Sequence, residues 1–211
     1  KNPTRQHTQR TTPRPTARVG GDKAMGDWNR VEQAIQVSYG AAGGVNQNTR
    51  EEASQFLLDF QQSPDASIIC LQKLPHPNLM VSVFCLSTLQ NSIEIGYDRL
   101  SAYHNKIREV MLSYMEMVLH QEVEIYLKKI FIKCLVTFFR SEYPENWPDF
   151  FKDVLQRTNC LVLVQQQQQN PNQQWSPALY KAIDMVLRVL TEIDDLVVAL
   201  THRYHERHHS T

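Results

Sequence analysis

The chain has 211 residues and a mass of 24.5 kDa, with 42% hydrophobic and 21% charged residues, as is ordinary for a folded protein. Its 22 basic and 22 acidic side chains cancel, but residues 1–24 carry a net charge of +5 and residues 25–211 a net charge of −5. The acidic body argues against a general nucleic-acid binder, and the few glycines and prolines argue against a fold rich in β-turns. No apolar run approaches the roughly 20 residues of a membrane span, so we expect a soluble protein without membrane insertion.

Residues 1–24 are rich in Thr, Arg and Pro and contain almost no large apolar side chain, which predicts a disordered basic leader. Met25 is the first methionine, so this segment is interpreted as a translated leader or a sequence artefact. The alternatives are a genuine basic arm for nuclear localisation or RNA binding, and a mitochondrial presequence. The lack of an initiating Met and of Leu or Phe disfavours the presequence.

From Asp27 onward the apolar residues recur with a helical period, and eight helices are predicted. The first runs over 28–39, with Asp27 as its N-cap and Gly40 as its stop. The second begins at Thr49, which has the spacing of a capping box with Glu52. The residues predicted to face inward are Trp28, Val31, Ile35, Tyr39, Ala53, Phe56, Leu57 and Phe60.

Four more helices are predicted over 64–74, 78–95, 98–118 and 123–142. Prolines separate the first two of these, and a YPEN sequence ends the last, because the residue before a proline leaves the helical region. The apolar residues of the helix over 98–118 recur at intervals of three and four, which is typical of one buried helical face.

A seventh helix is predicted over 148–164, and Trp147 just before it is predicted to be a buried anchor against Phe138, Phe150 or Phe151. The glutamine-rich residues 165–174 are predicted to be an exposed, mobile loop. The eighth helix spans 176–200. Its predicted inward residues are Leu179, Ile183, Val186, Leu187, Leu190, Ile193 and Val197.

The last residues, 201–211, are predicted to be a disordered, solvated tail, and the abrupt end after an apolar helix suggests a fragment of a longer chain. The tail holds four histidines, and spacing of i and i+4 on a helix could serve a metal. No Cys or carboxylate cluster elsewhere joins them, so no metal site is expected. These histidines are His202, His205, His208 and His209.

Eight helices in antiparallel pairs over about 175 residues give one pair per roughly 40–45 residues, the period of HEAT and armadillo repeats. The sequence therefore predicts an all-α fold, a HEAT/armadillo-like α-solenoid of about four antiparallel helix pairs over residues 25–200. A compact helical bundle is the alternative, but it predicts no fixed period.

No motif of an enzyme is present: there is no glycine-rich phosphate loop, no HExxH, no GxSxG and no pair of carboxylates in an apolar setting. The four cysteines lie in apolar runs, which predicts reduced core thiols in a reducing compartment. They are Cys70, Cys85, Cys134 and Cys160. We expect no enzymatic activity and no cofactor.

Three stretches together resemble the importin-β-like transport receptors. FQQSPDASIICLQKL (60–74) is similar to the junction between their first repeats, with Ser67 in place of the usual Trp. VFCLSTLQNSI (83–93) resembles the second helix of their second repeat. KKIFIKCLVTFFRSEYPENWPDFFKDVL (128–155) resembles the helix, YPxxWP turn and following helix of the exportins. Residues 179–198 resemble the corresponding segment of the tRNA exportins, the exportin-t group.

The resemblance implies a non-enzymatic export receptor that shuttles between nucleus and cytoplasm. It implies three partners: the small GTPase Ran in its GTP form, tRNA cargo bound through the full-length receptor, and nuclear pore proteins. It places a polar Ran-binding face on the second helices of the repeats, with Ile130 where the family has a lysine. The candidate residues are Gln90, Asn91, Glu94, Lys128, Lys129 and Lys133.

Alternatives remain open for these residues and for the chain. The polar stripe has the composition of an ordinary solvated helix face, and its lysines could also meet cargo RNA. The chain could be another exportin or an importin-β-like receptor with protein cargo, or a HEAT-repeat scaffold with no transport role.

Overall fold

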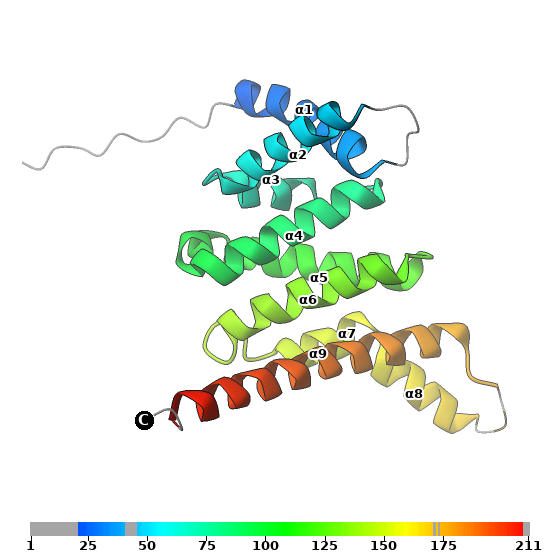
Figure 1. Ribbon diagram of the computed structural model, residues 1–211. Coiled ribbons are helices and arrows are strands. Elements are labelled where there is room, and N and C mark those ends of the chain that lie inside the picture. The colour runs from blue at the N-terminus through cyan, green and yellow to red at the C-terminus, as the bar shows by residue number, and fades with distance from the viewer. Residues whose placement is uncertain (1–20, 41–45, 171, 173, 209–211) are drawn as a thin grey trace, which may run out of the picture.

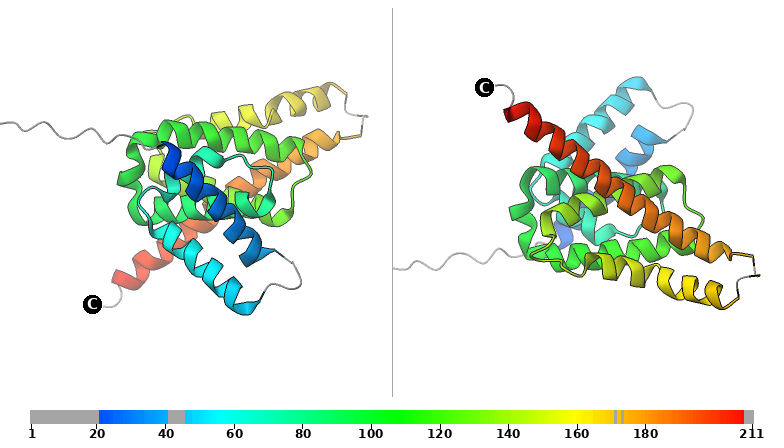
Figure 2. Two further views of the ribbon diagram at one scale, coloured as in Figure 1. Left: turned by 90° about the horizontal axis from the view of Figure 1, so that it is seen from above. Right: turned by 90° about the horizontal axis from the view of Figure 1, so that it is seen from below.

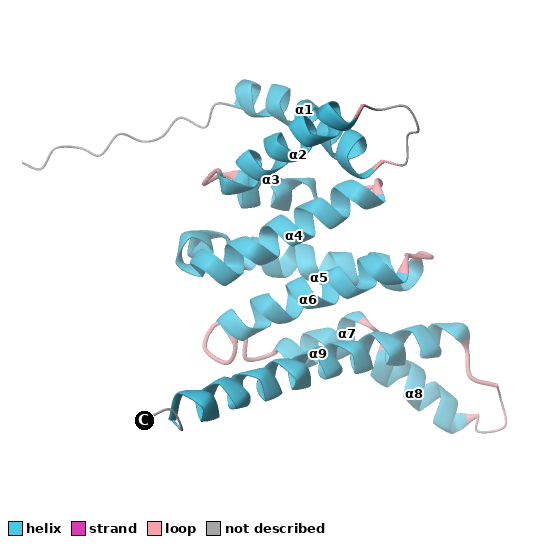
Figure 3. Cartoon of the chain, viewed as in Figure 1, coloured by secondary structure: helices cyan, strands magenta, loops and turns pink. Residues whose placement is uncertain are grey.

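The computed structural model describes residues 21–40, 46–170, 172 and 174–208, and within them the chain forms nine α-helices and one 3₁₀ helix with no strand (Figure 3). The prediction of an all-α fold is therefore confirmed. The elements are α1 (Gly21–Tyr39), α2 (Gln47–Gln62), α3 (Ala66–Lys73), α4 (Leu79–Gly96), η1 (Tyr97–Tyr103), α5 (His104–His120), α6 (Ile125–Glu142), α7 (Phe150–Arg157), α8 (Cys160–Gln169) and α9 (Pro177–His208).

The helices stack as consecutive pairs from α1 and α2 at one end to α9 at the other (Figure 1). Pairs form between α1 and α2, between α3 and α4, and between α5 and α6, while α8 packs against α9 and α7 packs against α5 and α8. The second helices α4, α6 and α9 contact one another in that order, and α5 contacts α7 behind them. In views along the axis of the stack, α5 and α8 lie on the same side, and α9 crosses the C-terminal end of the stack (Figure 2). This is the predicted solenoid of about four pairs.

The first helix of the fourth pair is divided, where the sequence predicts one helix over 148–164. The break lies at Thr158 and Asn159, and Asn159 adopts a left-handed conformation with φ of 52°. Asparagine tolerates this conformation better than most residues, because its short polar side chain can bond locally. The Thr158 hydroxyl donates to the Val154 carbonyl oxygen at 2.9 Å, which closes the end of α7.

Two predicted helix starts are wrong. α1 begins at Gly21, so Asp27 lies inside the helix, and residues 21–24 of the predicted leader are helical; residues 1–20 lie outside the described residues. α2 begins after Asn46, whose side chain accepts a hydrogen bond from the Asn48 backbone N–H at 3.3 Å. Asn46 is therefore the N-cap residue of α2, and Thr49, which the sequence predicts to be the N-cap, lies in the first turn of the helix.

Two predicted mobile segments also contain helix. α8 continues to Gln169, so the five glutamines of the run 165–169 are helical, which fits the high helix propensity of this residue. α9 is helical to His208, beyond the predicted end of the helix at residue 200. The side chains after residue 199 lie outside the described part, as do the predictions made for them.

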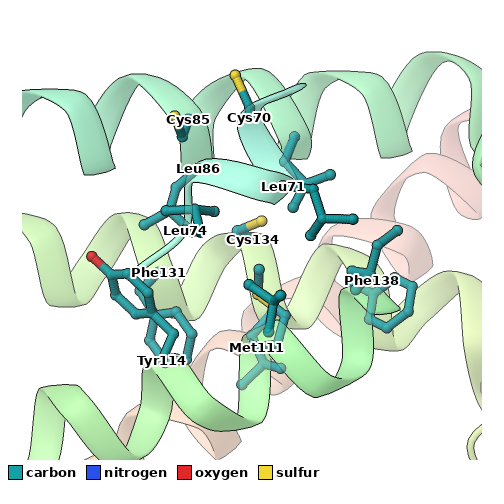
Figure 4. Packing of buried hydrophobic residues seen from close by; sticks show 14 of the residues in the cluster. Cys70, Leu71, Leu74, Cys85, Leu86, Met111, Tyr114, Phe131, Cys134 and Phe138 are labelled. Atoms are coloured by element: carbon teal, nitrogen blue, oxygen red, sulfur yellow. The ribbon is translucent and has the colours of Figure 1, made fainter. Parts of the chain in front are cut away.

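The core runs continuously through the stack, and Figure 4 shows its centre between α3, α4, α5 and α6. All four cysteines are buried and unpaired, as predicted. Cys70 and Cys85 lie together between α3 and α4, where hydrogen bonding between the two thiols, followed by burial, raises the pKa of Cys85. Such thiols are poor nucleophiles, because the thiolate is the reactive form.

Four apolar residues predicted to face inward are exposed instead: Tyr39, Leu187, Leu190 and Val197. On α9 the buried residues are Leu179, Ala182, Met185 and Val189, while Val186 and Ile193 are half-buried against the core. Periodicity identified α9 as amphipathic, but its apolar face is broader than its contact with the other helices, and only packing decides which part is covered.

Trp147 is completely buried, which confirms its predicted role as an anchor. Its ring meets Phe138 with 5.7 Å and Phe150 with 4.9 Å between centroids, and its Nε1 donates to Asp153 Oδ2 at 2.7 Å. Phe151 is 39% exposed and packs on Phe139 instead. The tryptophan thus fixes the turn between the third and fourth pairs.

A buried charge lies beside this anchor. Glu142 is fully buried at the end of α6, and its Oε2 is 3.5 Å from Arg108 Nη2 on α5. Arg108 also donates to the Asn146 carbonyl oxygen and lies 5.0 Å from the centroid of the Trp147 ring. Burial raises the pKa of Glu142 above its ordinary value. Together these contacts attach the α6–α7 turn to α5.

The stretch Leu79–His120 is long and apolar enough to cross a membrane by length and composition alone. It comprises α4, η1 and α5, whose apolar side chains form much of the core. The prediction that no apolar run approaches the length of a membrane span is therefore wrong for this stretch, although core helices of soluble proteins have the same length and composition.

Candidate partner-binding surface

The predicted polar residues of α4 divide between two surfaces. Gln90 and Glu94 are one helical turn apart, and Gln90 Nε2 donates to Glu94 Oε1 at 3.0 Å. Glu94 is exposed, and the pKa of Cys134 on α6 is raised to about 12 by burial and, secondarily, by the negative charge of Glu94. Asn91 lies on another side of the helix and lines a small hollow of about 270 Å³ with residues of α2, α3 and η1. Asn91 therefore does not join the other two.

The predicted lysines of α6 also divide. Lys129 and Lys133 are exposed and one turn apart, so they share a face of the helix. Lys128 is half-buried and lies about 100° around the helix from Lys129. Among the hydrogen bonds and ion pairs of the described residues, none involves the ammonium group of Lys129 or Lys133.

Lys129 and Lys133 form one wall of a groove between α6 and α9, with a volume of about 620 Å³. The opposite wall comes from α9. The groove is lined by Tyr126, Lys129, Ile130, Ile132, Lys133, Arg188, Thr191 and Glu192. We call this set the α6–α9 groove.

Arg188 is held in place by its own helix. Its Nε donates to both carboxylate oxygens of Asp184 at 2.8 Å, and this bonding raises the pKa of the guanidinium further. The Thr191 hydroxyl donates to the Leu187 carbonyl oxygen at 2.9 Å. The single Nε–H of Arg188 is thus shared between the two carboxylate oxygens, which holds its side chain against Asp184 on the same helix.

The structure therefore brings Lys129 and Lys133 to the groove and leaves Asn91 and Lys128 outside it. The α9 residues Arg188, Thr191 and Glu192 are absent from the sequence prediction. The sequence does contain a signal for these residues: their spacing of three and four places them on one polar face of α9, as the spacing of Lys129 and Lys133 places those two on one face of α6. Only the contact between α6 and α9 shows that the two stripes face each other.

No group of three or more His, Cys, Asp or Glu side chains that could hold a metal occurs among the described residues. The chemistry of the α6–α9 groove is that of three cations, one carboxylate and an apolar wall. It can bind an anionic or mixed apolar and anionic group.

The family described as Exportin 1-like protein matches residues 124–210, a segment that contains both helices of the groove. The chain is 26% identical to Exportin-T of Dictyostelium discoideum over 158 residues and 26% identical to Exportin-T of Mus musculus over 165 residues, and each alignment covers 74% of this chain. It is 29% identical to Exportin-1 of Schizosaccharomyces pombe over 136 residues, or 60% of this chain.

These alignments cover 13%, 15% and 12% of the three relatives, respectively, so the chain spans a small part of each. No solved structure matches the chain.

Proposed function

The chain is exportin-T-like in sequence, and we propose on this basis that it is part of a nuclear export receptor. In this proposal it binds Ran in its GTP form and contributes to the export of tRNA from the nucleus to the cytoplasm. The receptor shuttles between the two compartments, meets nuclear pore proteins on the way, and does not itself hydrolyse GTP.

One observation carries the proposal. The residues matched by the exportin family, 124–210, include both walls of the α6–α9 groove. The exposed amines of Lys129 and Lys133 in that groove suit acidic groups of a partner protein. We propose that Gln90 and Glu94 on the neighbouring α4, which are hydrogen-bonded to each other, also contact Ran. Lys128 and Asn91 lie outside the groove and are left out of this proposed contact.

Coupling of Ran and cargo follows from linkage. A ligand that favours one shape of the solenoid raises the affinity of a second ligand that favours the same shape, typically by about 1–3 kcal/mol. The described pairs supply part of the Ran-binding surface, and tRNA binds through the full-length receptor.

The test compares binding of this chain to Ran-GTP and to Ran-GDP. We expect binding to the GTP form, with Lys129→Glu/Lys133→Glu slowing association and reducing its dependence on ionic strength, because exposed charges act mainly on the association rate. The matched control is Lys106→Glu/Lys152→Glu, which reverses two exposed lysines on α5 and α7. Helicity and melting temperature should be unchanged in both.

Other outcomes identify the alternatives. Equal or absent binding of the two Ran forms would favour a HEAT-repeat scaffold without a transport role. If the full-length receptor binds Ran-GTP but tRNA does not increase its affinity for Ran-GTP, an exportin that carries protein cargo would be favoured. Loss of tRNA binding alone in the lysine variant would assign the two lysines to RNA.

A further inference from the structure

We propose that the α6–α9 groove recognises an acidic segment of a partner protein that inserts an apolar side chain between the two helices. This inference rests on the proposed function and specifies what the partner must present. It adds Arg188, Ile130 and Tyr126 to the candidate binding residues.

The charges of the groove favour a carboxylate-bearing partner. Lys129 and Lys133 on α6 are exposed, and their amines take part in no ion pair among the described residues. Arg188 lines the groove from α9, where Asp184 of the same helix already pairs with it. Carboxylates from a partner would therefore meet two lysines on the α6 wall and a paired arginine on the α9 wall.

The floor of the groove favours an apolar side chain beside those carboxylates. Ile130 and Ile132 come from the same helix as the two lysines, and Tyr126, 61% exposed, lies one turn before Ile130. Ile130 is half-buried, so part of its surface is still open. An inserted Leu- or Phe-like side chain would remove the open surfaces of Tyr126 and Ile130 from water, whereas Ile132 is already buried.

The same features disfavour an RNA backbone as the ligand. A phosphate chain and an acidic segment would both gain from the three cations and would both be repelled by Glu192, but a phosphate chain would leave the apolar floor unfilled. A body of net charge −5 over residues 25–211 adds a repulsion that a short acidic peptide feels much less than a polyanion does.

The decisive variant fills the groove without changing its charge. Thr191→Trp places a large ring between the walls and keeps Lys129, Lys133 and Arg188, while the control Gln156→Trp places the same ring on an exposed position of α7. We expect Thr191→Trp to weaken Ran-GTP binding by about tenfold or more, as for blockage of a central contact, and the control to leave it unchanged.

A second probe tests the groove without Ran. A synthetic Glu-Glu-Leu-Glu-Glu peptide should perturb NMR signals of Ile130, Ile132 and Thr191, and the same peptide with Ser in place of Leu should perturb them less. Ile130→Ala should bring the two peptides closer together in affinity. If circular dichroism and melting show that Thr191→Trp does not fold, Ile130→Ala replaces it as the test of the groove.

The two proposals fail in different ways. If Lys129→Glu/Lys133→Glu weakens Ran-GTP binding but Thr191→Trp does not, the groove inference is wrong and the proposed function stands. If the chain does not distinguish the two Ran forms but prefers the leucine peptide, the proposed function is wrong and the inference about groove chemistry stands. Equal binding of the two peptides overturns the inference, as does loss of tRNA binding alone in Thr191→Trp.

Discussion

At the scale of single residues, stability at the junction of the third and fourth pairs depends on one aromatic anchor. Trp147 is surrounded by Phe138, Phe150 and the guanidinium of Arg108, and its only polar atom is bonded to Asp153. A ring in such a site cannot be removed without leaving a cavity, because the two helix pairs are held apart by their other contacts.

Trp147→Ala is expected to lower the free energy of unfolding by about 3–5 kcal/mol, the usual range for a large aromatic removed from a core. Trp147→Phe should cost less, since it keeps an aromatic ring but loses the bond to Asp153. Chemical denaturation of both variants measures the difference. An Ala variant as stable as the natural chain would show that the junction does not depend on this ring.

Glu142 gives a prediction about pH. Burial raises the pKa of its carboxyl group in the folded protein, so the folded state binds a proton more strongly than the unfolded state. This contribution makes the free energy of unfolding fall as pH rises from the ordinary carboxyl value through the raised one. Glu142→Gln cannot ionise and should remove this part of the pH dependence, as measured by denaturation across that window.

The control is Glu145→Gln, an exposed glutamate in the same turn, which should leave the pH dependence as it is. A natural chain and a Glu142→Gln variant with parallel stability curves would contradict the prediction. They would mean that Arg108 compensates the charge of Glu142 completely.

At the scale of helices, the break between α7 and α8 depends on the backbone of Asn159. Its φ of 52° lies in the left-handed region, which most residues with a Cβ adopt only at a cost of roughly 1–2 kcal/mol. We expect Asn159→Ala to destabilise the chain by an amount of this order. Asn159→Gly should be neutral within a few tenths of a kcal/mol, because glycine accepts the same conformation freely.

Thermal melting of the two Asn159 variants distinguishes a backbone effect from a side-chain effect. Equal losses in the alanine and glycine variants would mean that the asparagine side chain matters and its conformation does not. A gain in stability for Asn159→Ala would mean that α7 and α8 join into one straight helix.

At the scale of the whole molecule, the fourth pair leaves an apolar stripe open. Leu187, Leu190, Val197 and Val198 of α9 are each between 44% and 56% exposed, although they lie within three turns of one helix. Exposed apolar surface drives association in water, although Asp194 interrupts this stripe. The chain by itself should therefore self-associate through α9.

Sedimentation velocity at several concentrations tests this expectation. Leu187→Lys/Leu190→Lys should shift the distribution toward the monomer without changing helicity, whereas the surface variant Lys106→Glu/Lys152→Glu should not. A natural chain that is monomeric at all concentrations would show that the stripe is too narrow or too interrupted by Asp194 to associate.

The sequence by itself determined the class of fold, the four helix pairs and the buried anchor, because these follow from the period of apolar residues along the chain. Burial of Trp147 was predicted from its place at the turn between two helix pairs, whereas Tyr143 in the same turn is 41% exposed. The cysteines followed from their apolar neighbours in the same way.

Only the tertiary structure decided which part of the apolar face of α9 is buried and which polar stripes meet. Lys129 and Lys133 were visible on α6, but Arg188, Thr191 and Glu192 became their neighbours only through the crossing of α6 and α9. Periodicity specifies the faces of one helix. The angle and register of its partner depend on side-chain packing between residues more than 50 positions apart, such as Lys133 and Arg188, and no local pattern records them.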